Sequence, residues 1–98
     1  MAKPYTVYVD DNYHYMDESE RYKHGEFDDC RSAVAACKRI VDEFLSTCDV
    51  KAGAEEMYKH YVSFGEDPWI TSGDSDCEFH AWDYAKERCR ELAGKEGP

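Results

Sequence analysis

The first group of side chains with potential chemistry is an acidic stretch near the N-terminus that also carries large aromatic rings. Its candidate binding residues are Asp10, Asp11, Tyr13, His14, Tyr15, Asp17 and Glu18. Carboxylates attract basic partners, and tyrosine rings give contact area at a low cost in conformational entropy. The stretch therefore predicts a surface that binds a basic protein segment. A structural interpretation stays open, in which Tyr13, Tyr15 and Met16 fold back onto the core.

A second acidic stretch, residues 74–80, supplies further oxygen, nitrogen and sulfur ligands, so the two stretches together could hold a divalent metal ion. The candidate metal ligands are Asp10, His14, Asp76 and His80. Neither stretch matches the EF-hand loop, which needs a glycine at position six and a glutamate at position twelve. No two histidines have the i, i+4 spacing of a zinc-binding helix. The sequence therefore predicts no dedicated metal site and no cofactor. A divalent-metal-binding protein or a small metal-dependent enzyme remains the alternative.

Signatures of other catalytic sites are missing from the sequence. It contains no glycine-rich phosphate loop, no GxSxG motif and no Cys/His pair at local spacing. Each of the four histidines has the chemistry of a general base, but none has an identifiable partner. These observations favour a binding module over an enzyme.

The charge of the chain is concentrated in two regions. Twenty-two acidic and twelve basic residues give a net charge of −10. Residues 10–29 hold eight acids and two bases, residues 66–83 hold six acids and no base, and residues 30–65 balance five acids with five bases. A negative surface repels phosphate and anionic lipid, so nucleic acid and membranes are disfavoured as partners. The sequence thus describes a nearly neutral scaffold with two acidic regions, and whether they meet depends on the fold.

The five cysteines form no CxxC pair. Cys30 and Cys37 lie two helical turns apart, about 10.5 Å, whereas a disulfide needs Cα atoms within about 7 Å. Cys77 is flanked by Asp76 and Glu78, whose negative charge disfavours a reactive thiolate. All five are expected to be reduced. The four predicted to pack as small apolar side chains are Cys30, Cys37, Cys48 and Cys89.

The N-terminal residues 1–5 contain no apolar run of the kind found in secretory signals. The longest uninterrupted apolar run is Ala33 to Cys37, whereas a helix that crosses a bilayer needs about 20 residues. We therefore expect a cytoplasmic protein without a transmembrane helix. The oligomeric state is not predicted.

Hydrophobic periodicity predicts the six elements that must position these candidates. They are strands over 5–9 and 20–24, helices over 29–47 and 54–64, a strand over 69–71 and a helix over 79–93. The clearest is the first helix, capped by Asp28 or Asp29. Its predicted apolar stripe is Cys30, Val34, Cys37, Val41, Phe44 and Cys48.

The predicted fold is one α+β domain over residues 1–98, with residues 1–3 and 95–98 expected to be frayed. It has a small three-stranded sheet and three helices in the order β-β-α-α-β-α. Helices of this kind bury their apolar stripes by packing on one face of the sheet. The strand order is not predicted.

Five segments distributed over the chain carry a resemblance to known proteins. They are residues 10–18 (DDNYHYMDE), 20–22 (ERY), 25–27 (GEF), 64–68 (FGEDP) and 81–85 (AWDYA). Together they resemble a group of small bacterial proteins of about 100 residues that carry no assigned function. The resemblance covers nearly the whole chain and implies a free-standing bacterial protein. It implies no activity, cofactor or catalytic residue.

Overall fold

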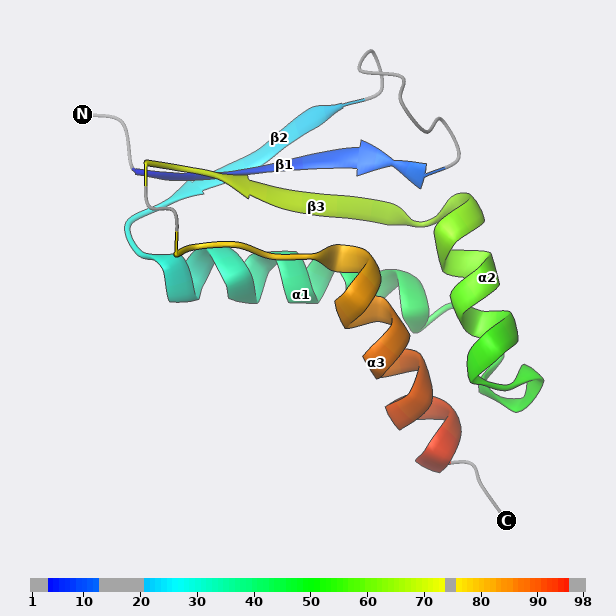
Figure 1. Ribbon diagram of the computed structural model, residues 1–98. Coiled ribbons are helices and arrows are strands. Elements are labelled where there is room, and N and C mark those ends of the chain that lie inside the picture. The colour runs from blue at the N-terminus through cyan, green and yellow to red at the C-terminus, as the bar shows by residue number, and fades with distance from the viewer. Residues whose placement is uncertain (1–3, 13–20, 74–75, 96–98) are drawn as a thin grey trace.

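A computed structural model describes residues 4–12, 21–73 and 76–95 of the chain. These residues form an α+β fold, as predicted, with three strands and three α-helices (Figure 1). The strands are β1 (Tyr5–Asp11), β2 (Tyr22–Phe27) and β3 (Glu66–Thr71). The helices are α1 (Cys30–Leu45), α2 (Ala54–Phe64) and α3 (Ala81–Lys95), with a short 3-10 helix η3 (Val50–Ala52) before α2.

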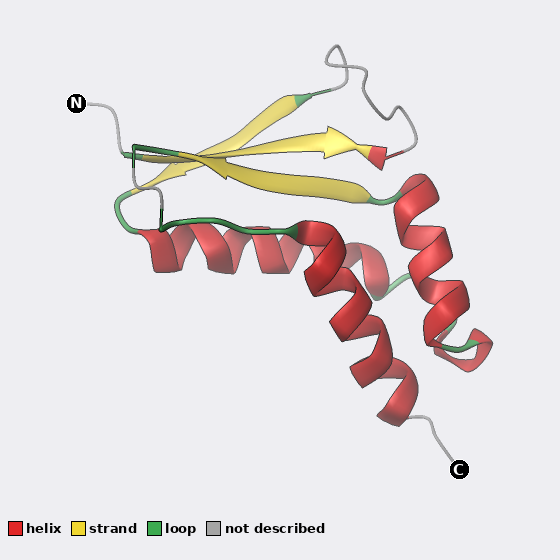
Figure 2. Ribbon diagram, in the orientation of Figure 1, coloured by secondary structure: helices red, strands yellow, loops and turns green. Residues whose placement is uncertain are grey.

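The sheet has the order β2-β1-β3, and the central strand β1 is antiparallel to both neighbours. Figure 2 shows the sheet as one layer, with α1 running along one of its faces and α2 and α3 extending away from that side. The opposite face of the sheet carries no helix from the described part of the chain. We call it the open face.

One face of β1 packs on α1. Val7 and Val9 are at most 1% exposed and lie in a hydrophobic cluster with residues of the helix. Side chains alternate between the two faces of a strand, so Tyr8 and Asp10 lie on the open face. The α1 residues of this cluster are Ala33, Cys37 and Ile40.

A second hydrophobic cluster joins the three helices below the sheet. Its centre includes Tyr61 of α2, which is fully buried. The other buried members are Val41, Leu45, Met57, Ala81, Ala85 and Cys89. Since α1 contributes to both clusters, it is the central helix of the fold.

The first helix is confirmed, although its buried face is broader than the predicted stripe. The Asp29 side chain caps α1 by accepting a hydrogen bond from the backbone N–H of Ser32 at 2.7 Å. Of the predicted stripe, Cys37 and Val41 are fully buried, and the other members are partly buried at the margin of the buried face. The face is broad because α1 contacts the sheet on one side and the other helices on another. The residues that α1 buries are Ala33, Ala36, Cys37, Ile40, Val41 and Leu45.

The second helix has the predicted bounds, and the third begins two residues later than predicted. Met57 and Tyr61 are buried on the inward face of α2. Residues 77–80 precede α3 without regular secondary structure. On α3, Ala85 and Cys89 are buried, whereas Trp82 is partly buried.

All three strands extend beyond their predicted bounds. Strand β1 continues through Asp11, β2 continues through Phe27, and β3 begins earlier, at Glu66. The sequence placed Gly25 after the second strand, but Gly25 lies inside β2 and pairs with Val7. A register shift between Val7 and Tyr8 leaves His24 as an extra residue in β2, so pairing with β1 continues past the glycine. In β3 the strand includes Pro68, which an edge strand tolerates because one side of it needs no backbone donor.

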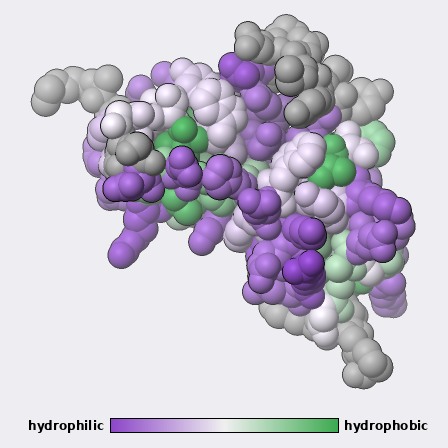
Figure 3. Space-filling model, viewed as in Figure 1, coloured by the Kyte–Doolittle hydropathy of each residue, from purple (hydrophilic) through white to green (hydrophobic). Residues whose placement is uncertain are grey.

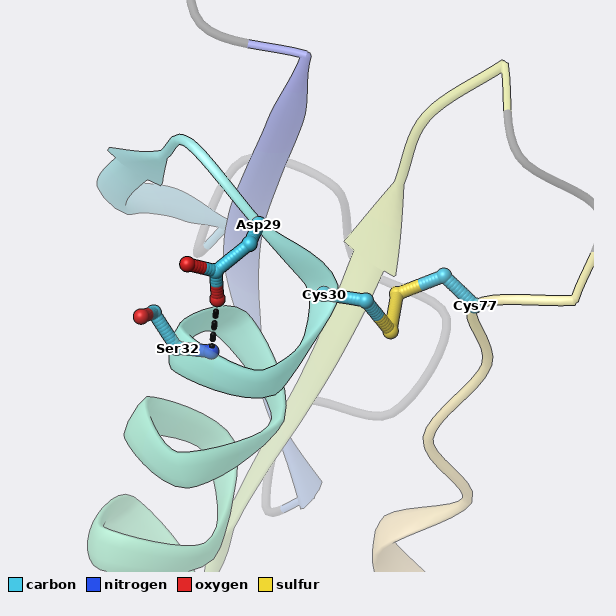
Figure 4. Close-up of a disulfide and its surroundings, with 4 residues drawn as sticks. All are labelled: Asp29, Cys30, Ser32 and Cys77. Carbon is cyan, nitrogen blue, oxygen red and sulfur yellow. Dashed lines mark hydrogen bonds between the residues drawn. A yellow bond between two sulfur atoms is a disulfide. The ribbon is translucent and has the colours of Figure 1, made fainter.

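The prediction that all five cysteines are reduced is wrong. Cys30 and Cys77 form a disulfide across a sequence separation of 47, with their Cα atoms 5.8 Å apart (Figure 4). Helical spacing excludes a bond between Cys30 and Cys37, but no local pattern indicates a partner 47 residues away. Cys37 and Cys89 are free and buried, in agreement with the packing role predicted for them, and Cys48 is free and half-buried.

No helix in the described ranges combines the length and the apolar character needed to cross a membrane. Figure 3 shows that hydrophilic residues cover most of the visible surface over α3.

Candidate binding site

A cleft of about 500 Å³ lies between the sheet and the start of α3. Asp10 comes from the first acidic region, and Asp67 and Asp83 come from the second. The described ends of the two acidic regions therefore meet at one place. The lining residues, which we call the acidic–aromatic cleft, are Asp10, Asp67, Trp69, Phe79, His80, Ala81, Trp82 and Asp83.

Strand register determines which side chains of the sheet reach this cleft. Asp10 of β1 pairs with Asp67 of β3, and Tyr8 pairs with Trp69. Residues directly opposite each other share a face, so all four lie on the open face of the sheet. Asp10, Asp67 and Trp69 line the cleft at the β3 edge of that face, where the start of α3 forms the other wall. The rings of Tyr8 and Trp69 stack with their centroids 5.2 Å apart. This stack fixes the orientation of the indole that forms one wall of the cleft.

Arg21 occupies part of the same face and pairs with Asp10. Its Nε lies 2.6 Å from Oδ1 of Asp10, and its Nη2 lies 3.3 Å from Oδ2. The guanidinium carbon of Arg21 also lies 5.0 Å from the centroid of Trp69. Arg21 therefore neutralises Asp10 by a charge-assisted contact and adds a cation–π interaction with the indole.

Asp67 has no such counter-charge. Its side chain forms no hydrogen bond or ion pair with any residue in the described ranges. Burial, followed by the negative charge of Asp10, raises the pKa of the Asp67 carboxyl to about 6. The ionised form is therefore poorly solvated and unpaired, and a cation in the cleft would stabilise it.

Asn12 holds the far wall of the cleft in place. It is 5% exposed, and its side chain accepts a hydrogen bond from Nε1 of Trp82 at 3.2 Å. Its Nδ2 donates to the backbone oxygen of Tyr61 at 3.0 Å, and its backbone N–H donates to the backbone oxygen of Gly65 at 2.9 Å. The end of β1, the end of α2 and the first turn of α3 are thereby connected through one side chain.

The indole nitrogen of Trp69 is buried and has no hydrogen-bond partner among the described residues. Buried indole N–H groups usually find an acceptor. Trp69 and Trp82 are the two tryptophans of the chain, and both line the cleft.

The structure describes two of the predicted binding residues, Asp10 and Asp11. Asp10 lines the cleft, whereas Asp11 pairs with Glu66 and lies on the other face of β1 by strand alternation. The remainder lie outside the described residues and are Tyr13, His14, Tyr15, Asp17 and Glu18.

The alternative metal site has little support from the described residues. They contain no group of three or more His, Cys, Asp or Glu side chains that could hold a metal ion. Asp10 is engaged by Arg21. The His80 side chain is 70% exposed and contacts Glu78 at 3.3 Å. A shared site with His14 depends on a residue outside the described ranges.

The sequence missed Asp67, Trp69, Trp82 and Asp83 as members of a site. Acids and aromatic rings interleave over residues 66–83 much as they do over residues 10–18, and this was the available signal. What the sequence lacked was the strand register, which places Asp67 beside Asp10.

Comparison with protein-family models, curated proteins and solved structures finds no match to this chain. The function is therefore argued from the chemistry of the cleft. That chemistry combines two indole rings with a carboxylate and an indole N–H that both lack a partner within the described part of the chain.

Proposed function

We propose that the protein is a small interaction module that binds a basic segment of a partner protein in the acidic–aromatic cleft. In this proposal a lysine or arginine side chain of the partner enters the cleft and pairs with Asp67. The observation that carries the proposal is the partly buried carboxylate of Asp67, which lacks a counter-charge among the described residues and faces a cleft walled by two tryptophans.

Electrostatics favour a cationic ligand over a neutral one. A carboxylate that is withdrawn from water gains more from a nearby positive charge than an exposed one does, because the local dielectric is lower. Asp83, which is exposed, adds a second negative charge at the rim. The net charge of −10 would also steer a basic partner toward the protein and raise the association rate.

The aromatic walls favour an organic cation over a bare metal ion. Indole faces attract ammonium and guanidinium groups and at the same time cover their apolar stems. A volume of about 500 Å³ also exceeds the needs of a single ion. The contact of Arg21 with Asp10 and Trp69 supports this proposal, because it is an internal example of the same chemistry.

Calorimetric titration with a short peptide rich in lysine and arginine tests the proposal. We expect saturable binding that weakens as the salt concentration rises, and no binding of an acidic peptide of equal length. Asp67→Asn should weaken binding of the basic peptide about tenfold, the effect expected for a partly buried charge contact. The matched control is Glu87→Gln, which removes one charge from the exposed surface of α3 outside the cleft.

Equal losses in the two variants would contradict the proposal, because the attraction would then come from net charge alone. Affinity that does not depend on salt would contradict it as well. Circular dichroism of both variants separates a loss of binding from a loss of fold.

A further inference from the structure

The disulfide lies next to the cleft. It joins Cys30, in the first turn of α1, to Cys77, in the segment that leads from β3 into α3 (Figure 4). Cys77 is only 5% exposed. Two residues further along the chain, Phe79 begins the part of the segment that lines the cleft. The bond therefore anchors one wall of the cleft to α1.

Few other interactions hold this segment. Residues 77–80 have no regular secondary structure, and none of their backbone N–H groups donates to a backbone oxygen in the described part of the chain. His80 accepts one backbone hydrogen bond from Tyr84, at the start of α3. Phe79 packs at the edge of both hydrophobic clusters. With the disulfide open, the packing of Phe79 would be the main contact left to hold the middle of the segment among the described residues, and the segment would sample more conformations.

We propose that the Cys30–Cys77 disulfide is a redox-controlled latch, and that the cleft binds its basic partner more tightly when the bond is closed than when it is open. This inference rests on the proposed function and adds the regulation of the same site. A pre-formed wall binds better because it does not have to be ordered at the moment of association.

The chemical step is thiol–disulfide exchange with a dithiol reductant. One thiolate of the reductant attacks Sγ of Cys30, which is more exposed than Cys77, and forms a mixed disulfide while Cys77 leaves as a thiolate. The second thiol of the reductant then displaces Cys30. Two electrons and two protons pass to the protein, which ends with two thiols, and the reductant leaves as its own disulfide.

The three free cysteines compete poorly for this exchange. Burial raises the pKa of the Cys37 thiol to about 12 and that of Cys89 to about 11, and it also raises the pKa of Cys48. Thiols of this kind form little thiolate and are inert toward disulfides. In a reducing compartment such as the cytoplasm, disulfides are usually transient and sense the redox state, which is the behaviour expected of a latch.

The test compares the oxidised protein with the same protein treated with dithiothreitol. Hydrogen exchange of residues 77–80 reports on the latch without any ligand, and fluorescence of Trp69 and Trp82 reports on the cleft. Reduction should raise the exchange of this segment and change the fluorescence. It should also weaken binding of the basic peptide at least about fivefold, reversibly on reoxidation. The double variant Cys30→Ser/Cys77→Ser should behave as the reduced protein does and ignore dithiothreitol, whereas Cys48→Ser should still respond.

Equal peptide affinities of the two folded forms would overturn the latch and leave the proposed function intact. Absence of peptide binding in both forms would overturn the proposed function together with the control of binding. Loss of the helical circular dichroism signal on reduction would also overturn the latch, because the bond would then be required for the whole fold and would not act on the cleft wall alone.

Discussion

Trp82 donates a hydrogen bond from its indole nitrogen to Oδ1 of Asn12 at 3.2 Å, joining residues that are 70 positions apart. The same asparagine donates to the backbone oxygen of Tyr61. One buried side chain therefore positions a wall of the cleft and closes the junction between the sheet and the helices.

Asn12→Ala should lower the free energy of unfolding by about 2–3 kcal/mol, because the substitution leaves the Tyr61 carbonyl and the Trp82 indole without this partner. Urea unfolding measures the loss. Ser63→Ala on the exposed surface of α2 is the control and should change stability by less than about 0.5 kcal/mol. Equal stabilities of Asn12→Ala and the parent protein would show that the junction does not depend on Asn12.

Gly65→Ala should destabilise the protein by about 1–3 kcal/mol, the usual cost of overpacking. A Cβ at position 65 would lie 2.5 Å from Cδ1 of Tyr61 and 2.8 Å from its backbone oxygen. Gly94→Ala in α3 is the control, because a Cβ there meets nothing within 4 Å and alanine is the better helix former. Thermal unfolding should show opposite signs for the two variants, and a stabilised Gly65→Ala would refute the close approach.

Asp67→Asn should stabilise the protein at pH 8 and have little effect near pH 4. The carboxyl pKa is about 6 in the fold and 3.8 in the unfolded chain, so the folded state binds this proton more tightly. Its contribution to stability is therefore greatest below about pH 4 and is lost as pH rises to about 6. We expect a gain on the order of 1 kcal/mol at pH 8. Urea unfolding from pH 4 to pH 8 measures the difference, with Glu87→Gln as the control. A difference that does not change with pH would argue against a raised pKa.

Reduction of the disulfide should lower the free energy of unfolding by about 2–4 kcal/mol. Opening a loop of 47 residues increases the entropy of the unfolded chain by roughly this amount. Guanidinium unfolding with and without dithiothreitol measures the effect, and Cys30→Ser/Cys77→Ser should match the reduced protein. Alkylation of all five cysteines in the denatured, unreduced protein would show that the bond is absent.

Local patterns predicted the helices well. The bounds of α2 agree with prediction because Met57 and Tyr61 repeat at helical spacing and Gly65 follows at the helix end. The Asp29 cap and the length of α1 are likewise local properties. The α+β class then follows from the number and order of the elements.

Non-local relationships were not predictable from the sequence. Gly25 resembles a strand terminator when taken alone, but pairing with β1 keeps it within β2. The partner of Cys30 is 47 residues away, and no local spacing identifies it. Asp67 became a candidate only when the register placed it opposite Asp10, whose charge Arg21 already neutralises.

The most direct test of the central claim uses the indole N–H signals of Trp69 and Trp82 in a nitrogen–proton correlation spectrum of the oxidised protein. These are the two tryptophans of the chain, and both line the cleft. Titration with the lysine- and arginine-rich peptide should shift both signals along one saturable curve, and Asp67→Asn should move that curve to about tenfold higher peptide concentration. Unshifted indole signals at a peptide concentration that binds the protein by calorimetry would contradict the account, because binding would then occur elsewhere.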